Sequence, residues 1–454
     1  MMLTALLRHA RPPSPLAGRL SVQSLLFALG EGTFMTGSAV FFTQIVGLSA
    51  AQVGLGLTFA GIAAFLAAFP MGKLVDRFGP KKMWAVSATG QAAMFAVWPL
   101  ITDFQGYVLM AVGMEVIGSL GGAAHGAYTI DVLPPDERVR SRAYMYSALN
   151  VGFTLGSLIG GIALAFHSND LLHALPWFTA AVFLVNALAI SRLPRAPHDD
   201  RTPEDRKVKV PGPGPMRNLG WLLTSFFTGV FWTNQVLLNI VIPLWLVEQT
   251  DAPRVLLAFL FGTNTVMCIF LPMAAARGVE DVPSALKAVR ISSTFFVVSC
   301  LITLATHDTV GWTTIALVWL GHVTVTGAEL YLSAATWALE AELMDPRQRG
   351  AYNGAAELSG TLGKVWAPAV YTFLAMHWGA SGWLVIAGII VVATVAIHPS
   401  TSLARRFLEQ HVPADVLADA RASTHDAEEE IATGPPTLIG SDVPAVGPSG
   451  DVTG

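Results

Sequence analysis

Long apolar stretches separated by short polar segments run from about residue 20 to residue 400 of the 454-residue chain. A helix needs about 20 mostly apolar residues to cross the hydrocarbon core of a membrane. Twelve stretches meet this requirement, so the pattern predicts an all-α integral membrane protein with twelve transmembrane helices. The expected spans are 20–45, 51–71, 81–102, 105–130, 145–166, 172–192, 218–247, 254–276, 284–306, 310–338, 351–376 and 380–399.

Polar segments divide the chain into two sets of six spans. Residues 1–19 precede the first set, and a linker rich in proline and charge, 193–217, separates the sets. The six-helix bundles are therefore expected over 20–192 and 218–400. The tail 401–454 offers too little apolar surface to offset the entropy cost of ordering, so we expect it to be disordered.

The distribution of positive charge predicts the orientation. Of the 27 lysines and arginines, only Arg254 falls in a loop on one side, and Lys364 lies within a span. The others cluster in alternate loops, the linker and the terminal segments, which by the positive-inside rule face the cytoplasm. We therefore expect a multi-pass protein of a bacterial plasma (inner) membrane with both termini cytoplasmic.

Composition narrows the class further. Charged residues make up 13% of the chain, against roughly 25% in soluble proteins, and the net charge of −4 does not suggest nucleic-acid binding. Cys268 and Cys300 both lie in apolar runs and suggest neither a disulfide framework nor a metal site. We expect a lipid bilayer and a small-molecule substrate as partners, no nucleic acid, no metal, and a monomer.

The two halves repeat short sequences in the same order. "FPMG" at 69–72 matches "LPMA" at 271–274, and "RVRSRAYMY" at 138–146 matches "RQRGAYNG" at 347–354. "TLG" follows in both halves, ending at Gly156 and Gly363. A constant separation of roughly 200 residues predicts two pseudo-symmetric bundles related by an axis along the membrane normal.

The polar loop "GKLVDRFGPKK", residues 72–82, connects the second and third spans. It resembles the loop signature of the major facilitator superfamily, with Pro80 replacing the usual arginine. This resemblance implies that superfamily's fold and secondary transport, with a loop motif and inner gate of Gly72, Asp76, Arg77, Gly79, Lys81, Lys82 and Asp131. Gly72 would allow close helix approach, Gly79 a tight turn and Asp76 an interaction with a helix N-terminus. Asp131 is the acid expected to pair with Arg77.

A glycine-rich stretch in the fifth span, "GFTLGSLIGG", is similar to an element of the superfamily's exporters. Ser157 replaces the proline of that element. The matching positions, which we expect to form a helix-packing motif, are Gly152, Gly156, Gly160 and Gly161. Glycines four residues apart also let helices pack closely in lipid whatever the direction of transport. The similarity therefore favours the drug/proton antiporter-like group without excluding uptake.

Two acidic residues lie near the middle of predicted spans, Glu31 in the first and Glu115 in the fourth. In the superfamily that the loop resembles, spans 1, 4, 7 and 10 line the central cavity. A charge at the bilayer centre costs about 2.5–3.5 kcal/mol on insertion scales, so such residues face the protein interior and tend to be functional. The hypothesis is that both bind and release protons, and that a cationic substrate competes for them. The alternative is a structural acid bonded to a threonine or to backbone on a neighbouring helix.

The C-terminal half supplies the other candidate residues. An aromatic and amide face in the seventh span suits an amphipathic ligand, although these side chains could instead pack against neighbours. The expected cavity residues are Phe227, Phe231, Asn234, Gln235, Asn239, His322 and Glu329. Glu357 and Lys364 are expected to form an intramembrane pair, and Glu340 and Glu342 to be gate or surface charges.

The sequence lacks a G-x-x-x-x-G-K-[ST] nucleotide loop and the common hydrolase and metalloprotease motifs. We therefore expect no enzyme and no cofactor, with the proton gradient as the energy source. The predicted function is proton-coupled efflux of a small amphipathic compound, a drug or secondary metabolite, by alternating access. The alternative is proton-coupled uptake of a nutrient or metabolite. A receptor or an intramembrane enzyme is disfavoured by the two buried acids and the missing catalytic constellation.

Overall fold

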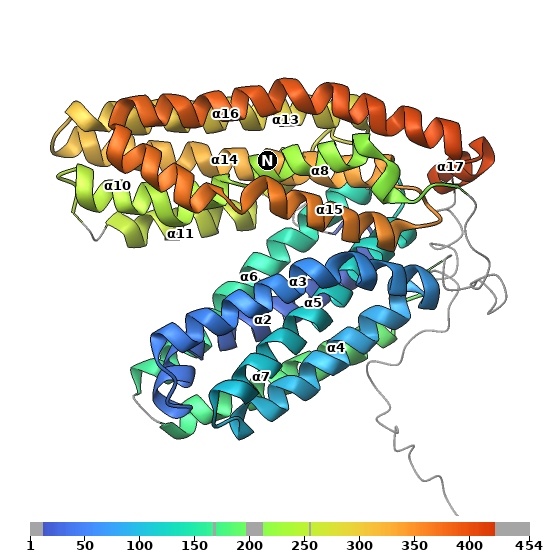
Figure 1. Cartoon of the computed structure of the whole chain (residues 1–454), viewed down its shortest axis with the longest axis horizontal. Coiled ribbons are helices and arrows are strands. Elements are labelled where there is room, and N and C mark those ends of the chain that lie inside the picture. Colours follow the sequence, from blue (N-terminus) through green and yellow to red (C-terminus); the bar gives the residue numbers. More distant parts are fainter. Residues whose placement is uncertain (1–11, 167–168, 197–211, 254–255, 423–454) are drawn as a thin grey trace, which may run out of the picture.

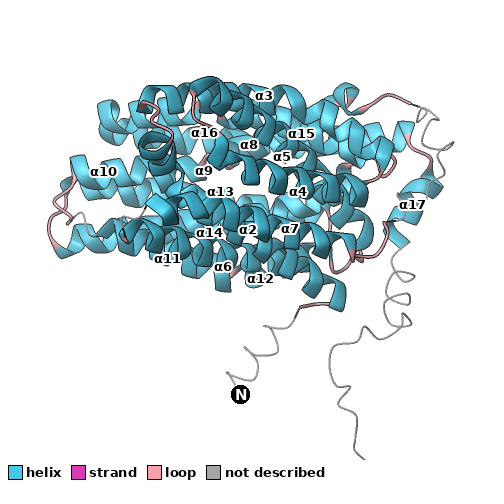
Figure 2. Ribbon diagram, turned by 90° about the horizontal axis from the view of Figure 1, so that it is seen from below, coloured by secondary structure: helices cyan, strands magenta, loops and turns pink. Residues whose placement is uncertain are grey.

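The computed structural model describes residues 12–166, 169–196, 212–253 and 256–422, and every regular element within these ranges is a helix (Figure 2). The helices of the first half are α2 (Pro15–Val40), α3 (Ala50–Phe78), α4 (Pro80–Val97), α5 (Phe104–Val132), α6 (Arg138–Ala165) and α7 (Asn169–Ser191). A π-helical turn, Phe41–Ile45, extends α2, and a 3₁₀ turn, Trp98–Leu100, follows α4.

The second half begins with a 3₁₀ turn, Pro215–Arg217. Its helices are α8 (Leu219–Phe231), α9 (Asn234–Val236), α10 (Ile242–Gln249), α11 (Leu256–Phe270), α12 (Pro272–Ala275), α13 (Val282–Ala305), α14 (Trp312–Leu343), α15 (Arg349–Lys364), α16 (Ala367–His411) and α17 (Ala414–Ala422). A π-helical turn, Leu237–Val241, joins α9 to α10, and a 3₁₀ turn, Thr306–Asp308, follows α13.

The helices confirm the predicted all-α membrane architecture. Within the described residues, eight helical segments are long and apolar enough to cross a membrane. One of them, Arg349–His411, is interrupted at Gly379, whose φ of 51° is left-handed, and therefore supplies two spans. With α2, α4 and the shorter α11, these segments account for the twelve predicted spans.

The seventh span is not the continuous helix that the sequence predicts over 218–247. It breaks after α8, where the Thr233 hydroxyl donates to the Val230 carbonyl at 2.6 Å and competes with helical bonding. The π-helical turn that follows comes directly before Pro243, which has no N–H to donate to the Asn239 carbonyl. The span is consequently built from three short α-helical pieces and a π-helical turn.

The tail is also more ordered than predicted. We expected disorder from residue 401, but α16 continues to His411 and α17 follows it. Apolar residues at helical spacing explain this, because Ala404 and Leu408 are buried against the second half. The rest of the predicted tail, 423–454, and much of the predicted linker, 197–211, lie outside the described residues.

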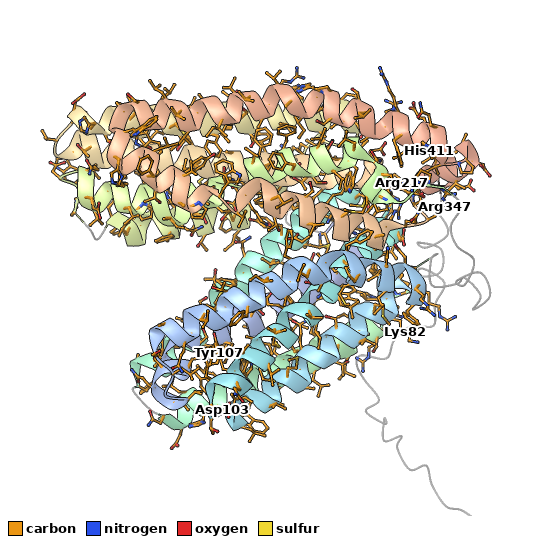
Figure 3. All side chains as sticks on the ribbon, viewed as in Figure 1. Lys82, Asp103, Tyr107, Arg217, Arg347 and His411 are labelled. Atoms are coloured by element: carbon orange, nitrogen blue, oxygen red, sulfur yellow. The ribbon has the colours of Figure 1, made fainter. Side chains whose placement is uncertain are left out.

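Figure 1 shows two groups of helices, which we call the N-terminal bundle (α2–α7) and the C-terminal bundle (α8–α16). They meet at one end and diverge towards the other. We call the end where they meet the basic end, because Lys82, Arg217 and Arg347 lie there, whereas Asp103 and Tyr107 mark the opposite end (Figure 3).

Large apolar side chains cover the outside of both bundles. Leu66, Leu109, Val392 and Val395 are each at least 65% exposed. Soluble proteins rarely expose large contiguous apolar patches, whereas a lipid-facing surface requires them. Both bundles have buried apolar cores, and the cluster that includes Trp383 of the C-terminal bundle extends to Ile130, Val139 and Ala143 of the N-terminal bundle.

Candidate functional site

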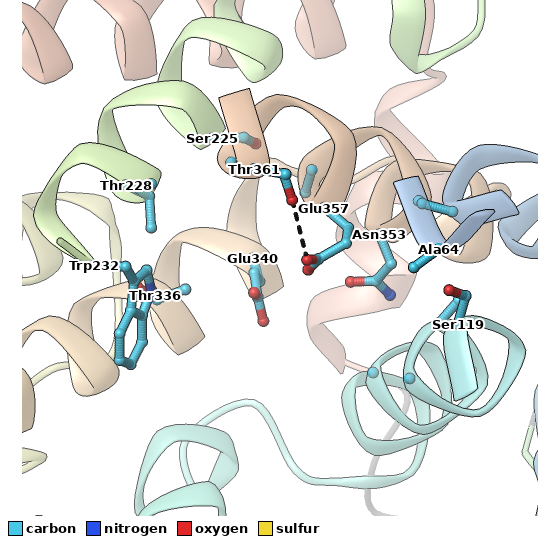
Figure 4. Close-up of a pocket in the computed structure, with 18 of the residues that line it drawn as sticks. Ala64, Ser119, Ser225, Thr228, Trp232, Thr336, Glu340, Asn353, Glu357 and Thr361 are labelled. Carbon is cyan, nitrogen blue, oxygen red and sulfur yellow. Dashed lines mark hydrogen bonds between the residues drawn. The ribbon is translucent and has the colours of Figure 1, made fainter. Parts of the chain in front are cut away.

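A cavity of about 590 Å³ lies between the two bundles (Figure 4). Its walls come from α3, α5, α8, α14 and α15, with Arg142 contributed by α6. Polar side chains alternate with aromatic and small residues around it. The polar lining residues include Ser119, Ser225, Thr228, Thr336 and Asn353, and the indole of Trp232 closes one wall.

Charged side chains in the cavity lining include two pairs and one unpaired acid. Arg142 binds Glu340 at 2.7 Å, and Lys364 lies 3.7 Å from Glu357. The predicted Glu357–Lys364 pair is therefore present, and it faces the cavity. Glu115 also lines the cavity but makes no hydrogen bond or ion pair with any described residue. The lining therefore has one more acidic than basic side chain, which gives it a net negative charge when all of them are ionised.

Glu31 lies close enough to Glu115 for their charges to interact, but it is half-buried and outside the cavity lining. The alternative structural role is not observed within the described residues, where Glu31 has no hydrogen bond. The nearby hydroxyls of Thr33 and Thr36 donate to carbonyls of their own helix, those of Leu29 and Gly32.

The expectation that the first span lines the cavity is wrong for the part of the chain that the structure describes, because α2 supplies no lining residue. Its small residues pack against neighbouring helices instead. A side chain at Gly30 would overlap the Phe183 ring of α7, and one at Gly32 would overlap the backbone of Phe153 in α6. These contacts hold α2 against α6 and α7, outside the set of helices that line the cavity.

The predicted cavity face of the seventh span is also wrong, because a neighbouring face of this helix lines the cavity. Phe227 lies in an apolar groove with Trp366, Phe231 belongs to the buried core, and Asn234 is fully buried. Gln235 and Asn239 lie outside the cavity lining. The residues that line the cavity are Trp221, Thr224, Ser225, Thr228, Gly229 and Trp232. Thr224, Ser225 and Thr228 lie close together on one side of α8, so this polar face was an available sequence signal, but the prediction followed the aromatic and amide residues instead.

His322 and Glu329 do not line the cavity either. The His322 ring is buried 6.4 Å from that of Phe261. Glu329 is buried and accepts hydrogen bonds from Tyr146 at 2.6 Å and from Asn264 at 3.2 Å. The two residues are seven positions apart on α14, where Glu329 contacts α6 and α11 and His322 lies near Phe261 of α11.

Asp76 holds the N-terminal bundle to the C-terminal bundle at the basic end. Its two carboxylate oxygens accept hydrogen bonds from the backbone N–H groups of Gly350 and Ala351, both at 2.7 Å. These groups belong to the first turn of α15, where N–H groups lack helical partners and the helix dipole favours an anion. A side chain at Gly72 would overlap the Gly350 carbonyl. The close helix approach expected at Gly72 and the contact expected between Asp76 and a helix N-terminus are therefore both present.

Asp131 pairs with Arg349 rather than with Arg77, so the predicted pair is wrong. Arg77 instead lies over the Phe78 ring, 5.3 Å from its centroid. The reason is the docking of the two bundles, which brings Arg349, the first residue of α15, against Asp131 at the end of α5.

The remaining loop residues are Gly79, Lys81 and Lys82. Lys81 donates to the Leu193 carbonyl, and Lys82 is exposed. Gly79 separates α3 from α4 with a φ of 93°, as the expected tight turn requires.

Three of the four glycines of the packing motif hold α6 against α2. Side chains at Gly152, Gly156 and Gly160 would overlap backbone atoms of α2. The inclusion of Gly161 in the packing motif is wrong. A Cβ added at Gly161 would have no atom of another described helix within 4 Å. The reason is helical geometry, since positions 152, 156 and 160 share one face and 161 is turned about 100° away.

Four further residues line the cavity that are not among the predicted ones: Arg142, His125, Asn353 and Trp232. Arg142 lies within the repeated "RVRSRAYMY" segment, so its position near a helix end was an available signal. Asn353 likewise lies within the repeated "RQRGAYNG" segment. Trp232 carried no comparable signal, because only the packing of the bundles determines whether it faces the cavity.

The chain is similar in sequence to proteins of a known family. Residues 20–368 match the model of the Major Facilitator Superfamily. The chain is 24% identical over 365 residues to the tetracycline resistance protein, class C, of Escherichia coli, covering 77% of this chain and 87% of that protein. It is 29% identical over 167 residues to multidrug resistance protein 1 of Bacillus subtilis, covering 36% of this chain and 40% of that protein.

Solved structures show the same fold. A bacterial homologue of the iron transporter ferroportin in the outward-facing state superposes with a TM-score of 0.67 at 14% identity, covering 86% of this chain and all of that one. The human organic anion transporter MFSD10 superposes with a TM-score of 0.61 at 16% identity, covering 85% of this chain and all of that one.

Proposed function

Because this chain belongs to the major facilitator superfamily, we propose that it is a secondary transporter that exports a small amphipathic compound in exchange for protons. It acts as a monomer in a bacterial plasma membrane, and its moving units are the predicted bundles 20–192 and 218–400. Efflux is supported by the two relatives whose names refer to tetracycline and multidrug resistance.

The single observation that carries this proposal is the acid that lacks a partner in the cavity. A volume of about 590 Å³ accommodates a drug-sized molecule. Among the charged residues that line it, Glu115 alone has no ion partner in the described chain. A carboxylate in this position can hold either a proton or the positive charge of a substrate, but not both at once. Competition of this kind couples export to proton entry.

The geometry supports a sequence of steps. The positive-inside rule assigns the basic end to the cytoplasm. The contacts of Asp76 and Asp131 with α15 close that end, so the cavity exchanges with the exterior. In this conformation Glu115 releases its cargo and takes up a proton from outside. When the bundles rock and the basic end opens, the proton leaves to the cytoplasm and a new substrate binds. Glu31, whose charge interacts with that of Glu115, binds and releases a proton in the same cycle.

Flux in proteoliposomes with an imposed pH gradient tests the proposal. Tetracycline and the aromatic cation ethidium serve as probes, and we expect either to move against the protons. Glu115→Gln abolishes gradient-driven accumulation, whereas Glu280→Gln, an exposed acid before α13, retains it. Movement of substrate in the same direction as protons would overturn efflux in favour of uptake. Wild-type accumulation by Glu115→Gln would overturn the role of Glu115.

A further inference from the structure

Glu329 occupies a buried position between the two bundles. Its side chain is only 5% exposed, lies on α14 of the C-terminal bundle and does not line the cavity. One carboxylate oxygen, Oε1, accepts from the Tyr146 hydroxyl of α6 at 2.6 Å, and the other, Oε2, accepts from Nδ2 of Asn264 in α11 at 3.2 Å. The bond to Tyr146 therefore crosses from one bundle to the other.

The groups that face Glu329 are neutral. The titratable ones are Tyr146 from α6 and Cys268 from α11, and the amides of Asn264 and Gln235 complete the set. In the described chain Glu329 has no ion pair, and Arg142, one turn from Tyr146 on α6, is bound to Glu340. A buried carboxylate with only neutral donors is expensive to keep charged. Binding of a proton removes that cost.

Tyr146 contacts α14 through its ring as well as through its hydroxyl. The ring meets that of Trp337 edge-on, with centroids 5.9 Å apart. Its hydroxyl therefore points to Glu329 and its ring rests on Trp337, both on the same helix of the opposite bundle. Alternating access requires the two bundles to move against each other, so this contact must change during transport.

We propose that Glu329 is a proton-controlled latch between α6 and α14, a role that rests on the alternating movement of the proposed function. With Glu329 charged, the bond from Tyr146 is charge-assisted and holds the basic end closed. When Glu329 binds a proton at Oε1, the carboxyl becomes neutral and the bond loses roughly half its strength. The bundles then separate at the basic end. Glu329 acts as a positioning residue, because it does not contact the cavity.

Spin-label distances across the basic end test the latch in the full-length protein without any substrate. Lys82→Cys on the N-terminal bundle and Arg406→Cys on α16 provide exposed label sites, whereas Cys268 and Cys300 are buried and stay unlabelled. In the otherwise unaltered chain, we expect the fraction of long distances to increase as the pH is lowered. Glu329→Gln should show the long distance at every pH, with a fraction about five-fold above that of the unaltered chain at alkaline pH.

Matched variants separate the latch from general damage. Tyr146→Phe removes the donor hydroxyl and should also increase the long distance at alkaline pH; it keeps the test available should Glu329→Gln fail to fold. Tyr331→Phe removes a hydroxyl two residues from Glu329, on a ring stacked 5.9 Å from Phe295, and should leave the distances unchanged. Glu280→Gln should do the same.

Two results would overturn the latch. One is a closed basic end with an unaltered pH response in both Glu329→Gln and Tyr146→Phe. The other is the absence of any pH response in the unaltered chain while proteoliposome flux remains proton-driven, which would leave the proposed function intact. A pH-dependent distance combined with uptake in the flux experiment would overturn efflux and leave the latch intact.

Discussion

Arg349 of α15 and Asp131 of α5 form an ion pair that joins the two bundles at the basic end. Both side chains are buried, at 5% and 9% exposure. Asp76 approaches the same helix turn and accepts hydrogen bonds from Gly350 and Ala351. The N-terminal bundle thus places two acids against the start of α15, where a cation, free N–H groups and the positive end of the helix dipole lie together. These contacts hold the two bundles together at this end.

Removal of Arg349 should destabilise the closed conformation strongly. Arg349→Ala leaves the Asp131 carboxylate buried without its partner, which typically costs about 3–5 kcal/mol. Thermal unfolding in detergent should show a clear decrease in Tm. Arg405→Ala is the matched control, because Arg405 pairs with Glu409 on an exposed surface and such pairs contribute about 0.3–0.5 kcal/mol. The exchange Asp131→Arg with Arg349→Asp should recover part of the loss. Equal Tm values for the two alanine variants would contradict a closing role.

The glycines of α6 give a second prediction with an internal control. Gly156→Val forces a branched side chain into the backbone of α2, and overpacking typically costs about 1–3 kcal/mol or more. Gly161→Val makes the same chemical change five residues away, where space is open. Unfolding followed by circular dichroism should show a lower Tm only for Gly156→Val. A comparable decrease for both would mean that the effect comes from helix propensity rather than from packing.

Local chemistry made much of the basic end predictable. Asp76, Gly72 and Gly79 act through backbone contacts, which depend on residue type and on position within a short loop. The partner of Asp131 was not predictable in this way, because Arg349 comes from the other half of the chain. The repeated segments did place Arg349 at a position equivalent to the start of α6. What the sequence could not provide was how one bundle docks on the other, and this docking determines the partner of Asp131.

The cavity was less predictable than the gate. The seventh span carries polar residues on more than one side, with hydroxyl groups in its first half and amides further along, so its sequence could not indicate which set faces the cavity. Glu31 and Glu115 could both be recognised as intramembrane acids, but only the packing of Gly32 against α6 shows that the helix of Glu31 stands behind the wall. Orientation around a helix axis is set by tertiary contacts.

The start of α13 gives a pH-dependent prediction. Asp281 caps this helix by accepting from the Ser284 N–H at 2.9 Å, and its hydrogen bonds with Ser284 lower the pKa of the carboxyl from its usual 3.8. A lowered pKa means that the charged form stabilises the fold at neutral pH, and that this contribution is lost as the pH falls through the lowered value. Asp281→Ala should cost about 1 kcal/mol at neutral pH, and the difference should shrink in acid. Asp281→Asn, which can still cap, should retain most of the stability. A constant difference at all pH values would contradict this account.

The charge balance of the cavity should determine which compounds bind. Lys364 lies 3.7 Å from Glu357, and both side chains are more than 40% exposed to the cavity and its opening. Lys364→Ala leaves Glu357 without its cation and raises the excess of acids from one to two. Two unit charges about 4 Å apart interact by about 1 kcal/mol in water, which corresponds to roughly a five-fold change in affinity. Ethidium should therefore bind several-fold more tightly, as measured by fluorescence polarisation.

The counterpart of this variant is Glu357→Gln, which leaves Lys364 unpaired and brings the net charge of the lining to zero. It should weaken ethidium binding by a similar factor, and the double variant Glu357→Gln with Lys364→Ala should return affinity towards the original value. Both shifts should diminish at high salt, because these groups are accessible to solvent and their charges are screened. Tighter binding of ethidium to both single variants would indicate that steric space, rather than charge, controls selection in the cavity.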